Sequence, residues 1–148
     1  FTAHGKTIQR QELFDWSKEE DEQIRYYSGT AVYKTTFRWK SKVKEDQQVY
    51  LNLGKVCDLA TVRVNGIDCG TIWTAPYRAD ITAALKKGVN ELEIEVTNTW
   101  ANALKGADEG KAPFDGIWTN AKYRRAEYTL LPAGLLGPLN FDVANKNK

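Results

Sequence analysis

Hydrophobic and polar residues alternate along most of the chain, and this period of two indicates β-strands. In the clearest run, one face of the predicted strand carries Ala31, Tyr33, Thr35, Phe37 and Trp39. We expect Phe37 and Trp39 to lie in the core. Similar alternation predicts strands near 49–53, 60–64, 67–73, 92–97, 128–131 and 139–143. About seven short strands with almost no helix favour an antiparallel β-sandwich.

Turn residues separate these strands. Asn65-Gly66 is the dipeptide that suits the positive φ angles of a type I′ hairpin. The segment 81–85, before Gly88, is typical of one helical turn, for which Asp80 or Thr82 is the expected cap.

Two further segments differ from the strand pattern. Ser17-Lys18-Glu19-Glu20 has the form of a capping box and predicts that the acidic run to Glu22 opens a short helix or turn. Residues 101–122 have no sustained period and contain three glycines and a proline. We predict a long loop there, and loops of that length are usually functional or mobile.

The 148 residues fit one domain that is large enough to bury its own core. We predict a β-sandwich over 28–144, preceded by a lead-in over 1–27 with a short helical turn and followed by a frayed tail over 145–148. The absence of methionine and the start at Phe1 lead us to expect a piece of a longer chain.

Composition and charge exclude several classes of protein. Hydrophobic residues at 42% and charged residues at 27% are typical of a soluble globular protein, and no stretch has the apolar length of a membrane span. The 21 basic and 19 acidic residues are mixed along the chain. We therefore expect neither a nucleic-acid partner nor a membrane partner.

The sequence lacks the residues that common metal sites and nucleophilic catalysis need. The single histidine, His4, excludes most zinc sites and a Ser-His-Asp arrangement inside the fold. Cys57 and Cys69 are predicted to be buried, reduced thiols, with a disulfide as the alternative. No loop has the spacing of calcium ligands. We therefore assign no cofactor and leave a structural calcium unassigned.

Glycoside hydrolysis needs two carboxylates about 5 to 10 Å apart. Glu93 and Glu95 alternate on one strand and meet that distance, but a solvated strand face has the same pattern. Asp108 and Glu109 lie in the predicted loop without an activating partner. No catalytic residue is assigned.

Several residues suit carbohydrate binding, in which aromatic rings stack on sugar C–H faces and polar groups contact the hydroxyls. The candidates lie at two strand ends and in the long loop: Trp73, Tyr77, Arg78, Asn98, Trp100, Asp115 and Trp118. They are predicted to converge at one end of the sandwich. The alternative is that Trp73 and Trp100 fill the core or a domain interface.

Four motifs carry a resemblance to a known family. They are Ser28-Gly29-Thr30-Ala31-Val32-Tyr33, Val64-Asn65-Gly66 and Pro76-Tyr77-Arg78-Ala79-Asp80-Ile81-Thr82, with Leu131-Pro132-Ala133-Gly134 near the end. Over roughly 16–143 the chain resembles the sugar-binding domain of family-two glycoside hydrolases, and more closely the C-terminal domain of bacterial α-L-rhamnosidases.

The resemblance implies a galactose-binding-like jelly roll of about seven or eight mostly antiparallel strands with one or two short helical turns. It implies a separate catalytic domain in the parent chain, a carbohydrate partner, and a periplasmic or secreted location. The predicted function is a non-catalytic carbohydrate-binding or active-site-supporting domain of a polysaccharide-degrading enzyme. The alternative is a structural domain that packs on the catalytic domain without sugar affinity.

Overall fold

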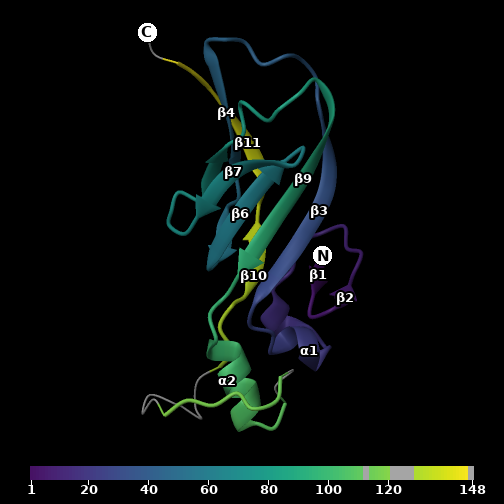
Figure 1. Cartoon of the computed structure of the whole chain (residues 1–148), viewed down its shortest axis with the longest axis vertical. Helices are drawn as coiled ribbons and strands as arrows, with labels where there is room; N and C mark the ends of the chain where they lie inside the picture. The colour runs from purple at the N-terminus through teal and green to yellow at the C-terminus, as the bar shows by residue number, and fades with distance from the viewer. Residues whose placement is uncertain (112–113, 121–128, 147–148) are drawn as a thin grey trace.

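The computed structural model describes residues 1–111, 114–120 and 129–146. Two layers of β-strands form an elongated sandwich, and a helix lies beyond one end of it (Figure 1). All strand pairs are antiparallel. The predicted antiparallel β-sandwich is confirmed.

Within the described residues, the strands form three sheets. The largest consists, in spatial order, of β2 (Lys6–Thr7), β1 (Thr2–Ala3), β3 (Thr30–Trp39), β9 (Gly88–Thr97), β6 (Leu59–Val64) and β7 (Ile67–Ile72). A second sheet consists of β11 (Asn140–Asn145), β4 (Gln47–Asn52) and β8 (Arg78–Asp80). The third pairs β10 (Gly134–Gly137) with β5 (Lys55–Cys57). The helical elements in the described ranges are a 3-10 turn, η1 (Trp16–Lys18), and two helices, α1 (Glu22–Arg25) and α2 (Ala101–Asp108).

The pairing of β3 with β9 is the longest in the fold. It runs over ten residues from Thr30↔Thr97 to Trp39↔Gly88. On β9, Leu92, Ile94 and Val96 are buried while the intervening glutamates face outward. A slip of one residue would exchange these two faces, so the apolar alternation fixes the register.

The N-terminal segment belongs to the packed unit. Strand β1 pairs with β3 at Thr2↔Val32, and Trp16 is fully buried. The Trp16 backbone N–H donates to the Ala133 carbonyl oxygen at 3.0 Å. The residues predicted as a lead-in do contain a short helix, and they also close one side of the core.

Two local predictions were wrong. Residues 101–108, predicted as loop, form helix α2, which is favoured because Ala103 and Gly106 are buried against the sandwich. Ser17 does not cap a helix. Asp21 caps α1 instead, because its carboxylate accepts from the Gln23 N–H at 3.0 Å.

The predicted turns are confirmed. Asn65 and Gly66 join β6 to β7 with φ angles of 51° and 78°. The Asp80 carboxylate accepts from the Thr82 N–H at 3.0 Å and caps a single turn in which the Leu85 N–H donates to the Ile81 carbonyl oxygen.

Other expectations were met in part. Both cysteines are free thiols, but only Cys57 is buried and Cys69 is half-buried. Phe37 and Trp39 pack against the margin of the core and remain half-buried. Residues 129–131 are not in a strand, and Tyr128 lies outside the described residues.

The tail begins later than predicted. Strand β11 includes Asn145, and the Lys146 N–H donates to the Asp46 carbonyl oxygen at 2.6 Å; residues 147–148 are outside the described part. No helix in the described ranges has the length and apolar character needed to cross a bilayer.

A substitution at Gly134 can test how closely the chain around Trp16 packs against the chain around Gly134. A Cβ at Gly134 would lie within 3 Å of the Trp16 indole, whereas one at Gly70, which has the same φ of 103°, would meet nothing within 4 Å. Both Gly→Ala changes carry backbone strain, and only Gly134→Ala adds a clash in the core. We expect Gly134→Ala to lower the free energy of unfolding by about 2 kcal/mol more than Gly70→Ala, measured by urea denaturation. Equal losses would contradict this account.

Candidate functional site

An open hollow of about 510 Å³ lies beside helix α2. Its lining comes from the start of α2 and from the segment 114–119, and consists of Trp100, Leu104, Phe114, Asp115, Gly116, Ile117, Trp118 and Thr119. Most of these side chains are apolar. Three of the predicted carbohydrate-binding residues, Trp100, Asp115 and Trp118, therefore share one concavity.

Helix α2 holds one wall of the hollow in place. The Ala103 N–H donates to the Ser28 hydroxyl at 3.1 Å. The Asn102 amide bonds to both backbone groups of Leu131, at 2.8 Å each. These contacts tie the helix to the start of β3 and to the chain before β10, so the position of Trp100 at its N-cap is fixed by the sandwich.

The other wall is anchored through Phe114. Its ring packs edge-on against His4 at 5.0 Å between centroids and lies 6.0 Å from the ring of Tyr27. Tyr27 is part of the buried core. The loop that carries Trp118 is thus attached to the packed part of the protein.

Two indole rings in this hollow are accessible. Trp100 is 62% exposed and Trp118 is 73% exposed. Neither ring fills the core of this chain, so the alternative of a core role does not hold for Trp100. Exposed indoles beside a carboxylate, here Asp115, combine a flat apolar surface with a hydrogen-bond acceptor.

The structure places the other predicted residues elsewhere. Trp73 is 76% exposed and follows β7, at the end of the sheet that also carries Asn98. Tyr77 is half-buried, and Arg78 lies over the Tyr50 ring at 4.6 Å in the second sheet. Within the described residues, none of these side chains lines the hollow.

The Asn98 side chain is hydrogen-bonded to the backbone. Its amide nitrogen donates to the Tyr27 carbonyl oxygen at 2.8 Å, and its amide oxygen accepts from the Gly29 N–H at 2.9 Å. These bonds close the start of β3 onto the end of β9. The amide groups predicted for a sugar are therefore engaged within the fold.

Comparison with known proteins identifies the family. The family described as the galactose-binding-like domain of glycosyl hydrolase 2 matches residues 3–130. The chain belongs to this family. A protein of Formosa agariphila named "Putative beta-glucuronidase" is 40% identical over 89% of the chain and 13% of its own length.

Solved structures agree with this galactose-binding-like domain. A rhamnosidase from Novosphingobium sp. PP1Y is 42% identical, with a TM-score of 0.77 over 92% of the domain and 12% of that enzyme. An FMN-binding beta-glucuronidase from Facaelibacterium prausnitzii L2-6 shares the fold, with 23% identity and a TM-score of 0.57 over 95% of the domain and 19% of that protein. The predicted resemblance is confirmed, and the domain spans about an eighth of the first two relatives.

Glu93 and Glu95 of the galactose-binding-like domain form part of a charge network. The Arg63 guanidinium contacts their carboxylates at 3.2 and 2.7 Å, and the Lys34 ammonium contacts Glu93 at 2.8 Å. The hydrogen bond from Lys34 lowers the pKa of Glu93. A general acid needs a raised pKa, so Glu93 does not have the property of the acid in such a pair.

The described ranges of the domain contain no group of three or more His, Cys, Asp or Glu side chains that could hold a metal ion.

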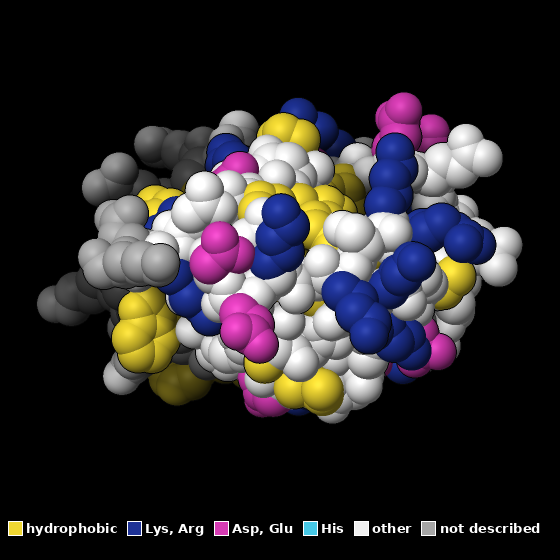
Figure 2. All heavy atoms as spheres, turned by 90° about the horizontal axis from the view of Figure 1, so that it is seen from above, with side chains coloured by type: hydrophobic (Ala, Val, Ile, Leu, Met, Phe, Trp, Pro, Cys, Tyr) yellow, Lys and Arg dark blue, Asp and Glu magenta, His cyan; other side chains and the backbone are white. Residues whose placement is uncertain are grey.

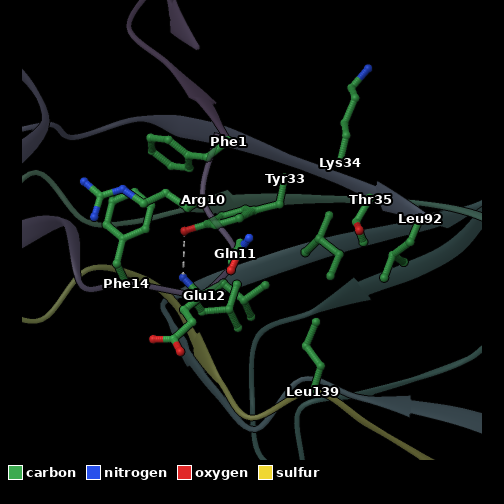
Figure 3. A pocket seen from close by; sticks show the side chains of 13 residues that line it. Phe1, Arg10, Gln11, Glu12, Phe14, Tyr33, Lys34, Thr35, Leu92 and Leu139 are labelled. Carbon is green, nitrogen blue, oxygen red and sulfur yellow. Dashed lines mark hydrogen bonds between the residues drawn. The ribbon is translucent and has the colours of Figure 1, made fainter. Parts of the chain in front are cut away.

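Sequence patterns did not predict a second cavity, of about 270 Å³, between β3, β9 and the N-terminal segment (Figure 3). Tyr33, Leu92 and Leu139 lie around it, with Arg10 and Glu12 nearer its margin. Thr35, which lines this cavity and is exposed, is the one polar residue in the alternation of Ala31, Tyr33, Thr35, Phe37 and Trp39. The segment 10–14 that closes this cavity has no periodic pattern.

One wall of the cavity contains a buried hydrogen-bond centre. The Tyr33 hydroxyl oxygen accepts from the Trp16 indole N–H at 2.7 Å and from the Leu135 N–H at 3.1 Å; the second bond is dashed in Figure 3. Burial raises the pKa of Tyr33 to about 12 from its ordinary value of 10. Removing this oxygen would leave two donors without a partner.

We expect Tyr33→Phe to lower the free energy of unfolding at neutral pH by about 1 to 3 kcal/mol, the cost of buried unsatisfied donors. The pH dependence has a defined sign. An acid whose pKa rises on folding stabilises the fold below its unfolded pKa and loses that contribution as pH rises from about 10 to about 12.

Denaturant unfolding across that range should therefore show a loss in the wild type of about 2 kcal/mol in excess of the loss in Tyr33→Phe. Tyr50→Phe is the control, because the described residues give the Tyr50 hydroxyl no hydrogen bond. Parallel pH profiles for wild type and Tyr33→Phe would refute the assignment.

Proposed function

We propose that this domain is a non-catalytic carbohydrate-binding part of a larger glycoside hydrolase and that the hollow beside α2 is its binding surface. The observation that carries the proposal is the pair of exposed indoles, Trp100 and Trp118, in one concavity with Asp115. A contiguous exposed apolar patch, unlike a single exposed ring, marks an interaction site.

The chemistry of the hollow suits a sugar ring. An indole presents a flat face to the axial C–H groups, and a carboxylate accepts hydrogen bonds from hydroxyl groups. Asp115 and Thr119 supply the polar groups in the lining. The hollow is open, which suits a unit within a polymer rather than an enclosed small molecule.

The catalytic groups are proposed to lie outside this domain. Glu93 and Glu95 are neutralised by Lys34 and Arg63, and the domain corresponds to 12–13% of its larger relatives. A catalytic domain of the parent chain would supply the acid and the nucleophile or base. We also propose a periplasmic or secreted location, where a polymeric substrate is accessible.

One observation favours a second function. The lining is mostly apolar, with Leu104, Phe114 and Ile117 between the indoles. An apolar patch of this kind also suits packing against a neighbouring domain. In that case the domain would support the catalytic domain without affinity for sugar.

Titration calorimetry of the chain against rhamnose, galactose, glucuronate and pectic oligosaccharides tests the first function. We expect saturable heat that Trp118→Ala and Trp100→Ala each weaken about tenfold or more, the cost of losing a stacking aromatic ring. Trp73→Ala is the matched control, because it removes an equally exposed indole outside the hollow, and it should leave the affinity unchanged.

If no ligand of the panel produces binding heat with folded protein, sugar binding by the isolated domain is rejected and the packing function is favoured. An equal loss in Trp73→Ala would move the site away from the hollow.

A further inference from the structure

Basic side chains gather at the end of the sandwich opposite α2. Figure 2 looks onto this end, and Lys and Arg side chains crowd one half of it. We define the basic end by seven exposed residues: Arg38, Lys40, Lys42, Lys44, Lys86, Lys87 and Lys146. This surface lies far from the hollow and is independent of it.

The fold brings three separate segments together here. The pair Trp39↔Gly88 ends the β3–β9 pairing, so Lys40 and Lys87 lie one residue beyond the paired ends of the two strands. The loop 40–46 then leads to β4. Within this loop, the Glu45 carbonyl oxygen accepts from the Lys146 ammonium at 3.0 Å. Residues far apart in the sequence thus contribute to one surface.

Positive charge exceeds negative charge at this end. Segments 38–46, 86–88 and 146 contain seven basic residues and two carboxylates, Glu45 and Asp46, an excess of five positive charges. None of the seven forms an ion pair within the part of the chain that the structure describes. Six other basic residues do pair with carboxylates: Lys6, Arg10, Lys34, Arg63, Lys105 and Lys111.

Partly exposed aromatic rings lie beside these charges. Trp39, between Arg38 and Lys40, is half-buried, and its ring lies 5.5 Å from that of Phe141. Phe141 is 37% exposed. An aromatic surface next to ammonium groups offers stacking and charge together.

We propose that the basic end binds an anionic polysaccharide, whose carboxylate or sulfate groups contact the lysines. Ammonium groups are compact point charges on flexible stems, which suits single anionic groups spaced along a sugar chain. The net charge of the whole chain is only +2, which gives little general attraction for nucleic acid. The surface would hold an acidic polymer at a distance from the hollow.

The test uses polymers with matched backbones. Polygalacturonate is compared with its methyl ester, and dextran sulfate with dextran, by titration calorimetry or affinity electrophoresis at low salt. We expect binding to the anionic member of at least one pair and to neither neutral member, with binding weakened by added salt because exposed charges are screened. The pair that binds distinguishes a carboxylate ligand from a sulfate ligand.

Charge reversal locates the site. Lys40→Glu with Lys87→Glu should weaken binding about tenfold or more. The matched control, Lys18→Glu with Lys55→Glu, changes two exposed lysines outside the basic end and alters the net charge equally. It should lose less than about threefold. All four side chains are exposed, so both variants should keep the wild-type unfolding midpoint.

Three outcomes would overturn the proposal. They are absence of binding to both anionic polymers, equal losses in the two charge-reversal variants, and equal or tighter binding to duplex DNA at matched charge concentration. Trp118→Ala should leave polyanion binding unchanged, so failure of the hollow as a sugar site and failure of the basic end are separate results.

Discussion

Burial of the Trp16 indole imposes the constraint on which the rest of the sandwich depends. A buried indole N–H needs an acceptor, and the Tyr33 hydroxyl supplies one at 2.7 Å. That oxygen also accepts from the Leu135 N–H. The N-terminal segment, the long strand β3 and the late strand β10 are therefore joined at one atom, and only a glycine at 134 leaves room for the ring.

This junction determines where the candidate surfaces lie. With Trp16 and Tyr33 fixed, β3 and β9 run as one ten-residue pair, and their two ends become the two ends of the molecule. The C-terminal end of β9 leads directly into α2 and the hollow. The opposite end of the same pair carries the lysines. The sheet thus separates an apolar concavity from a basic surface.

The strands were largely predictable because alternation reflects burial on one face. The contribution of the first 27 residues was not, since β1 and β2 have two residues each and show no period. Helix α2 was missed for a related reason. Gly106 reads as a helix breaker, yet its lack of a side chain allows contact with Tyr26, and that contact is visible only in three dimensions.

The candidate site was predictable in part for similar reasons. Trp100, Asp115 and Trp118 come from two segments close in sequence, and the structure places them in one hollow. Trp73 and Arg78 come from other strands, whose place in the sandwich depends on sheet order that no local pattern encodes. Asn98 has the residue type of a ligand contact, but its amide satisfies the backbone at Tyr27 and Gly29.

The outer face of the sheet and its basic end obey different electrostatic rules. On the face, Glu93 lies between Lys34 and Arg63, so cross-strand neighbours neutralise each other, as stable pairing favours. Beyond the last pair, Lys40 and Lys87 lie one residue past the paired ends of the same two strands. Within the described residues these lysines form no ion pair, and solubility alone is better served by mixed charges. An anionic partner at the basic end would supply the counter-charge for these lysines.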